Sequence, residues 1–394
     1  MLKNYITTAW RNISRHKVFA AINVVGLSLG ISACLVIFLI TRFELSFDNY
    51  HPNKEKIYRV VSDTYSSKSG EEHAGSIPTP GQFAIRNEIP GFESVALFYN
   101  YEATVTVQDK EPVKKFARPL LGEGQSSTIV VAEPQYFNLF QYNWLAGNAA
   151  VLNEPYTVVL TESKARLYFG EHAPADYLNK TIVYNDTLNV KVAGIVKDPV
   201  KNTDFFFTDF ISYHTLKKDI ASASWNDGYT NEQLFVKLAN NVSPAQINIQ
   251  IENLRNQHYK PNQNSKTTWV LQPLSALHFD ARYNDAYSRK AHLPTLYALM
   301  GIALFILLIA VINFITLSTA QSIDRAKETG IRKICGSTGN ELVIRFLIES
   351  FILTILALVL AIAGIYPLLA VFKSYIPEGV SFSFLVYQPG CFYW

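Results

Sequence analysis

The 394-residue sequence lacks the short motifs that identify many classes of enzyme. It has no G-x-x-x-x-G-K-[ST] phosphate-binding loop, no H-E-x-x-H metal motif and no paired C-x-x-C. The eight histidines are scattered, and we expect His51, His73, His214 and His278 at the surface or in turns rather than on a metal. The sequence therefore predicts a protein that is not an enzyme and that has no catalytic residue, metal site or cofactor of its own.

Cysteine and net charge are also scarce. The three cysteines, Cys34, Cys335 and Cys391, fall in an apolar run, a basic loop and the C-terminal segment, so we expect no intramolecular disulfide. The formal net charge is only +3, and this small basic excess is too dispersed for a nucleic-acid-binding surface. We therefore expect no nucleic-acid partner.

Three long apolar runs are present instead, at residues 18–41, 293–320 and 347–372. The first two contain no charged residue, and the third contains only Glu349. Each run has 24 to 28 residues, whereas a helix needs about 20 to cross the hydrocarbon core of a bilayer. Residues 31–34 resemble a lipoprotein cleavage site, but the apolar run continues beyond them and is longer than a signal core. The runs predict three transmembrane helices.

The region 42–292, between the first two runs, has the patterns of a mixed α and β domain. Alternating residues predict strands at 56–61, 104–107, 157–160 and 190–196. Helical patterns cover 80–89, 161–169 and 243–257. The predicted fold class is an integral membrane α-helical protein with three transmembrane helices and a large extracytoplasmic α+β domain.

Basic residues predict how the transmembrane helices are oriented. Residues 1–17 carry four Lys or Arg and no acidic residue, in an amphipathic helical pattern suited to the membrane interface. The loop 321–346 carries five Lys or Arg. Because positive residues in short loops stay in the cytoplasm, we expect residues 1–17 and 321–346 to be cytoplasmic. Residues 42–292 and 373–394 are then outside.

Two polar residues within the runs are expected to have structural roles. Asn313 is expected to hydrogen-bond a neighbouring helix, and lining a path is the alternative. Glu349 lies near the cytoplasmic end of its run, where it can reach the interface or pair with Arg345. No continuous row of charges crosses the spans, which argues against a channel or a proton-coupled transporter.

The loop 321–346 contains the most specific pattern in the sequence. From 325 to 337 it reads R-A-K-E-T-G-I-R-K-I-C-G-S, and 338–341 match a capping box for the helix that runs into the third span. The stretch resembles the cytoplasmic loop of FtsX/MacB-type ABC transporter permeases, which typically reads R-x-K-E-I-G-I-R-K-x-x-G-A/S. Thr329 replaces the usual isoleucine.

Other parts of the chain carry the same resemblance. F-N-L-F at 137–140, V-V-L-T-E-S at 158–163 and V-A-G-I-V-K-D at 192–198 are similar to the MacB-like periplasmic core domain. W-R-N-I at 10–13 and G-L-S-L-G at 26–30 resemble the start of long permeases from Bacteroidetes-like bacteria. This family has four spans in each module, so we expect the sequence to be truncated ahead of a fourth span.

The resemblance implies a function and a location. The chain is expected to be the permease subunit of an ABC transporter, which couples ATP hydrolysis by a separate ATPase to a periplasmic conformational change. The expected cargo for export or efflux is a peptide, a macrolide-like compound or a lipoprotein. The alternative is an FtsX-like signal transducer that regulates a periplasmic partner such as a cell-wall hydrolase. The expected location is the cell inner membrane, with the large domain in the periplasm.

The resemblance also implies partners. These are the ABC ATPase, which would bind the ATP, membrane lipid, and a second copy or a second permease module. A periplasmic adaptor or an outer-membrane channel is a further expected partner. The residues expected to couple to the ATPase are Arg325, Ala326, Lys327, Glu328, Gly330, Ile331, Arg332, Lys333 and Gly336.

Overall fold

The computed structural model divides into two compact units. The helical unit contains Met1–Leu45 and Leu293–Gln388, and the sheet domain is formed by Ser46–His292. The structure describes residues 2–68, 70–107, 113–116, 127–220, 224–225, 232–258, 265–283, 289–324, 330–331, 334, 338–373, 376–377 and 379–380.

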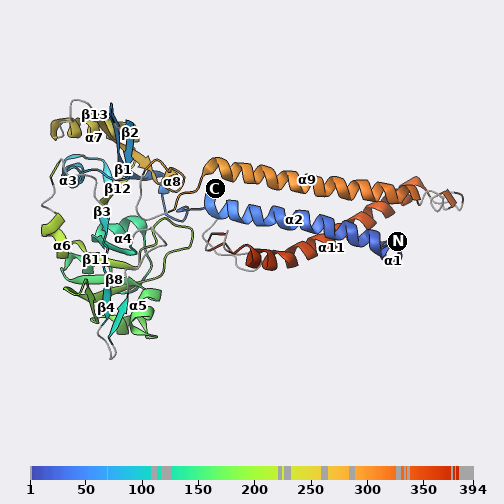
Figure 1. The fold of residues 1–394 in the computed structure, drawn as a ribbon, viewed down its shortest axis with the longest axis horizontal. Coiled ribbons are helices and arrows are strands. Elements are labelled where there is room, and N and C mark those ends of the chain that lie inside the picture. The colour runs from blue at the N-terminus through green and yellow to red at the C-terminus, as the bar shows by residue number, and fades with distance from the viewer. Residues whose placement is uncertain are drawn as a thin grey trace. The chain divides into compact units, whose positions relative to one another are not determined.

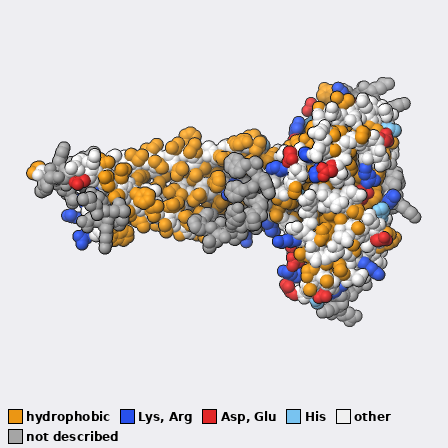
Figure 2. All heavy atoms as spheres, turned by 180° about the vertical axis from the view of Figure 1, so that it is seen from behind, with side chains coloured by type: hydrophobic (Ala, Val, Ile, Leu, Met, Phe, Trp, Pro, Cys, Tyr) orange, Lys and Arg blue, Asp and Glu red, His pale blue; other side chains and the backbone are white. Residues whose placement is uncertain are grey.

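The structure gives the bounds of four helices in the described part of the helical unit. They are α1 (Leu2–Arg15), α2 (Lys17–Leu45), α9 (Leu293–Asp324) and α11 (Gly339–Val371) (Figure 1). The last three are long and apolar enough to cross a membrane. Hydrophobic side chains cover most of the long helices on the face that Figure 2 shows. The predicted fold class, with three membrane-spanning helices and a large mixed α+β domain, is confirmed.

Helix α2 is the centre of the helical unit, because it packs along both α9 and α11. Small residues allow these close approaches. A Cβ added at Gly30 of α2 would lie 2.4 Å from the Cβ of Ala310 in α9, so only glycine fits there. On the α11 side, the Ser32 hydroxyl donates to the Ala361 carbonyl at 3.2 Å. Helices α9 and α11 make no extensive contact in the described part of the chain.

The sheet domain is built from many short elements. Its helices are α3 (Thr79–Glu88), α4 (Pro134–Phe140), α5 (Glu162–Phe169), α6 (Tyr213–Ile220), α7 (Pro244–His258), α8 (Leu274–Leu277) and the 3-10 turns η1 (Lys54–Lys56), η2 (Ala149–Asn153) and η3 (Pro174–Tyr177). Its strands are β1 (Ile57–Ser66), β2 (Gly70–Ala74), β3 (Phe92–Asn100), β4 (Val105–Val107), β5 (Lys114–Phe116), β6 (Ile129–Ala132), β7 (Trp144–Ala146), β8 (Thr157–Thr161), β9 (Thr181–Tyr184), β10 (Leu188–Val196), β11 (Asp209–Ser212), β12 (Glu232–Leu238) and β13 (Ser265–Pro273).

The described strands join into one mixed sheet in the order β13-β1-β12-β3-β6-β11-β8-β10-β9-β4-β5, with β2 beside β1 and β7 beside β10. Most neighbouring strands are antiparallel, while β6–β11 and β8–β10 are parallel. Successive side chains of a strand point to opposite faces of the sheet. Helices pack on both of these faces, so that neighbouring residues of one strand enter different cores. On β3, for example, Phe98 joins a core that includes α4, and Leu97 joins a core that includes α3 and α7.

The strand and helix predictions for this domain are confirmed at the level of elements. Strands β1, β4, β8 and β10 and helices α3, α5 and α7 overlap the predicted segments, with shifts of a few residues at their ends. These segments are recognisable because their local pattern of apolar residues agrees with the faces that they bury. Strands such as β11 and β12, which are buried along their whole length, give no such alternation.

Candidate functional site

The loop between α9 and α11 contains the residues predicted to couple to an ATPase. Arg325, Ala326, Lys327, Glu328, Arg332, Lys333 and Gly336 lie outside the described residues. Gly330 and Ile331 are helical and exposed, with the Ile331 side chain 63% exposed. A Cβ added at Gly330 would meet no atom of a described residue within 4 Å. This part of the loop therefore presents an open helical surface, and the role of the loop residues stays a prediction.

Helix α11 joins this loop to the third span without an interruption. The backbone N–H of Thr338 donates to Glu341 Oε2 at 3.2 Å, as the predicted capping box requires. The helix then continues to Val371, through Pro367. The same helix therefore contains both the end of the loop and the third span.

Glu349 is the single carboxylate within the third apolar run, and it is 7% exposed. Asn12 of α1 donates to both of its carboxylate oxygens at 2.8 Å. The sequence analysis missed this partner, because the two residues are 337 positions apart. The contact links α1 to α11. It also supplies hydrogen-bond donors to the Glu349 carboxylate, which would be unfavourable without a partner in this nearly buried position.

A second group of contacts lies inside the sheet domain. It joins one aromatic residue to four polar residues, and we name it the crossing cluster: Phe47, Asp48, Thr203, Asp204 and His278. The hydroxyl of Thr203 and the backbone N–H of Asp204 both donate to Asp48, the latter at 3.2 Å. His278 Nδ1 lies 2.9 Å from Asp204 Oδ1. All five residues are 7% exposed or less. The hydrogen bonds compensate in part for the loss of water around these groups, since Asp204 Oδ2 is buried and has no hydrogen-bond partner among the described residues.

The crossing cluster joins the two ends of the sheet domain. Phe47 stacks on the ring of His278, with centroids 3.5 Å apart. The backbone N–H of Ala291 donates to the carbonyl of His278 at 2.9 Å. In the sequence, Phe47 follows the last residue of α2 by two positions, and Ala291 precedes the first residue of α9 by two. The chain therefore enters and leaves the sheet domain through one buried group of contacts.

Burial changes the chemistry of this cluster. It raises the pKa of the Asp204 carboxyl, the hydrogen bond from His278 acts in the opposite direction, and the charge of Asp48 raises the pKa further. His278 lies in a turn, one of its two expected locations, but its side chain is buried. Among the described residues, no group of His, Cys, Asp or Glu could hold a metal ion.

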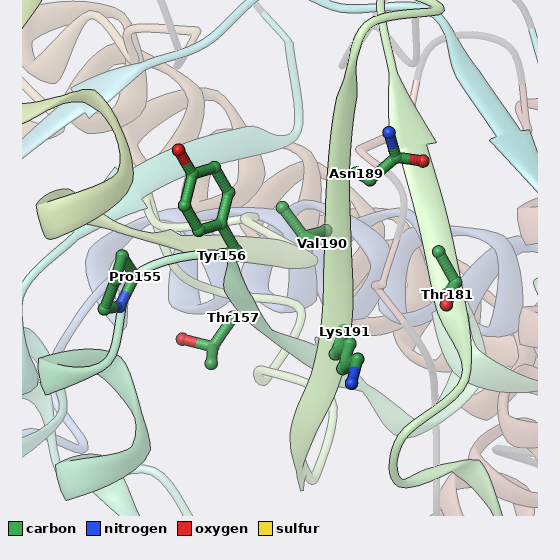
Figure 3. A pocket seen from close by; sticks show the side chains of 7 residues that line it. All are labelled: Pro155, Tyr156, Thr157, Thr181, Asn189, Val190 and Lys191. Carbon is green, nitrogen blue, oxygen red and sulfur yellow. The ribbon is translucent and has the colours of Figure 1, made fainter.

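A hollow of about 420 Å³ lies where β8, β9 and β10 meet. Figure 3 shows the side chains that line it: Pro155, Tyr156, Thr157, Thr181, Asn189, Val190 and Lys191. The Tyr156 side chain is 57% exposed, and its backbone has a left-handed φ of 59°. The described lining offers hydrogen-bonding groups and one ammonium group to a polar partner, but no pair of acid and base groups for catalysis.

Comparison with known proteins agrees with this architecture. The family model of the MacB-like periplasmic core domain matches residues 20–254, and that of the FtsX-like permease C-terminal region matches residues 300–394. The chain therefore belongs to the FtsX/MacB-type family of ABC transporter permeases, which generally work with an ATPase subunit. It is a membrane protein with a periplasmic-type domain. No curated protein matches the chain.

Three solved structures resemble part of the chain. A domain of a putative permease protein from Porphyromonas gingivalis has 17% identity and a TM-score of 0.45, over 63% of this chain and 98% of that one. The periplasmic region of MacB from Actinobacillus actinomycetemcomitans has 16% identity and a TM-score of 0.35, over 53% and 87%. The extracellular domain of the noncanonic ABC-type transporter YknZ from Gram-positive bacteria has 11% identity and a TM-score of 0.35, over 53% and 99%.

Proposed function

We propose that this protein is the permease subunit of an export or efflux system, in which a separate ATPase moves the spans and the spans move the sheet domain. The observation that carries the proposal is the crossing cluster. Because Phe47 and Ala291 both contact His278, a displacement of α2 against α9 acts on one buried group of contacts. Each helix is only two residues from the cluster in the sequence.

The cytoplasmic side of the path starts at the loop before α11. The open surface at Gly330 and Ile331 accommodates a partner, and α11 begins nine residues after Gly330 with a capped first turn. The Asn12–Glu349 contact then holds α1 to α11. For this path to work, the ATP-bound state of the partner must bind one arrangement of the helices better than the other.

The protein acts in the cell inner membrane, with its N-terminus and the loop in the cytoplasm and the sheet domain in the periplasm. ATP is bound by the partner, and the chain itself performs no catalysis and needs no cofactor. Its cargo is a peptide, a macrolide-like compound or a lipoprotein already outside the inner membrane. A second copy or permease module completes the pathway, and a periplasmic adaptor or outer-membrane channel receives the cargo.

The second candidate function is that of an FtsX-like transducer, which would use the same movement to control a cell-wall hydrolase. The large size of the sheet domain, Ser46–His292, favours export. A cell-based export or resistance assay, run beside a cell-wall hydrolase assay, separates the two. Loss of hydrolase control with unchanged export would favour the transducer.

The test of the ATPase contact uses Gly330→Leu in the intact protein, co-expressed with its proposed ABC ATPase partner. We expect co-purification of the ATPase to fall about tenfold or more, the change that corresponds to roughly 1.4 kcal/mol. Gly301→Leu is the matched control, because Gly301 of α9 also has nothing within 4 Å of an added Cβ. Equal recovery of the ATPase with both variants would contradict the proposed contact.

A further inference from the structure

Two side-chain amides in the membrane-spanning helices have no hydrogen-bond partner among the described residues. Asn23 of α2 is 1% exposed, and neither its Oδ1 nor its Nδ2 is bonded. Asn313 of α9 is exposed on the helical unit and forms no hydrogen bond to a described residue, so its expected bond to a neighbouring helix stays a prediction. An unpaired amide is unfavourable both in a protein interior and against lipid.

Both amides lie near the interface between α2 and α9. Asn23 lies about one helical turn away from the position in α2 that is opposite Asn313. A Cβ added at Gly26 of α2 would lie 3.5 Å from Asn313 Nδ2. Asn23 precedes Gly26 by three residues, which is about one turn of helix. Gly30 follows Gly26 by four residues and lies against Ala310. Asn313 therefore faces Gly26, which has no side chain to bond it, while the amide of Asn23 lies about one turn away along α2.

We propose that α2 and α9 have a second register, in which α2 has moved by one turn toward its own C-terminal end. This shift of about 5 Å places Gly26 where Gly30 now lies, against Ala310. The same shift brings Asn23 to the present position of Leu27, the residue next to Gly26, and so close to Asn313 that the two amides can hydrogen-bond each other. The tight contact with Ala310 admits only glycine, and the Gly26/Gly30 spacing supplies a glycine in both registers.

The slide takes place at the α2–α9 interface, because the other helices are tied to α2. Asn12 of α1 is bonded to Glu349 of α11, and Ser32 of α2 is bonded to the Ala361 carbonyl. Helix α9 packs along α2 and has no extensive contact with α11 in the described residues. Helices α1, α2 and α11 therefore move together past α9, in a one-turn step of the kind known between packed helices.

Opposing contacts keep the two registers close in free energy. The amide pair favours the second register. The stacking of Phe47 on His278 favours the first, because Phe47 follows the end of α2 by two residues and Ala291, bonded to His278, precedes α9 by two. The protein alone therefore populates both registers. Only the use of the slide in transport rests on the proposed function.

The variant Gly26→Ala distinguishes the two registers. In the first register its Cβ makes an ordinary contact at 3.5 Å with Asn313 Nδ2. In the second, the added Cβ occupies the position of Gly30, where it would lie 2.4 Å from the Ala310 Cβ. The variant therefore leaves the present structure intact and blocks the alternative. Gly301→Ala is the matched control, since an added Cβ there meets nothing within 4 Å.

The measurement is the distance between spin labels in a variant without native cysteines, in lipid nanodiscs and without any ATPase. One pair joins Val18 of α2 to Phe305 of α9, and the other joins Phe38 of α2 to Ile315 of α9; all four residues are exposed. Because α2 and α9 are antiparallel, the slide shortens the first distance and lengthens the second. We expect a second population displaced by about 5 Å in each pair.

The second population should disappear in Gly26→Ala and in Asn313→Leu and persist in Gly301→Ala. A single population in the unsubstituted helices, displacements of the same sign in both pairs, or a second population that survives Gly26→Ala would each overturn the second register. A failure of the Gly330 co-purification test would instead count against the ATPase contact and leave these distances unchanged.

Discussion

Asn12 Nδ2 lies 2.8 Å from each carboxylate oxygen of Glu349, so that one amide joins the first and the last described helices of the helical unit. The carboxylate is nearly buried, at 7% exposed. A buried carboxylate requires compensating donors, because the loss of water around it is expensive. The N-terminal helix is therefore part of the helical unit as well as a candidate for the membrane interface.

The first prediction concerns this contact. Asn12→Leu removes a donor to a nearly buried carboxylate and should cost about 1–3 kcal/mol of stability. We expect a lower thermal unfolding midpoint for the purified protein in detergent. Glu349→Gln should cost less, because an amide oxygen can still accept from Asn12. Equal midpoints for Asn12→Leu and the unchanged protein would show that Asn12 is dispensable.

The second prediction concerns α11 as a rigid connection. Val343 is 57% exposed and lies in the first turns of α11, so Val343→Pro changes the backbone with little change in packing. Proline there removes a backbone hydrogen bond and should cost about 3 kcal/mol or more locally. We expect the variant still to bind the ATPase, but ATP turnover should no longer drive export.

Two assays check this prediction together: ATP turnover in proteoliposomes and a cell-based export or resistance assay. Val343→Ala is the control, since it shortens the side chain and keeps the backbone hydrogen bond. If Val343→Pro leaves both activities unchanged, movement is not transmitted through the start of α11.

The third prediction concerns pH and the crossing cluster. Burial raises the pKa of Asp204 above its ordinary value of 3.8. A carboxyl with a higher pKa in the folded than in the unfolded protein stabilises the fold fully below pH 3.8, and this contribution is lost as pH rises through the folded pKa. Asp204→Asn cannot ionise, yet its Oδ1 can still accept from His278. The stability of the Asp204→Asn variant should therefore decrease less than that of the unchanged protein as pH rises.

The measurement for Asp204 is the thermal unfolding midpoint of the full-length protein across roughly pH 4 to 8, the range in which a raised carboxyl pKa acts. Asp198→Asn is the matched control, because Asp198 is an exposed carboxylate bonded to Ser163. Identical pH profiles for the unchanged protein and Asp204→Asn would exclude Asp204 as the titrating group.

The fourth prediction concerns orientation. Leu167 of the sheet domain is 54% exposed, and Ile331 of the loop is 63% exposed. In a variant without native cysteines, Leu167→Cys should react with a membrane-impermeant maleimide in intact spheroplasts. Ile331→Cys should react only after lysis, because basic loops stay in the cytoplasm. The reverse pattern of labelling would require the opposite orientation.

The sequence by itself determined the elements whose signal is local. The three apolar runs predicted the spans, because the length and hydropathy that a bilayer requires are properties of consecutive residues. The start of α11 was predictable for the same reason, since Thr338 and Glu341 are only three positions apart. Strands β1, β4, β8 and β10 were recognisable from the alternation of neighbouring residues.

The tertiary structure decided which distant residues meet. Glu349 could be recognised as unusual in an apolar run, but its partner Asn12 is defined only by the packing of α1 against α11. His278 had no distinctive neighbours in the sequence, yet folding places it between Asp204 and Phe47. The physical reason is that a hydrogen bond or a ring stack depends on a separation of a few ångströms in space, and spacing along the chain constrains that separation only within one helix or strand.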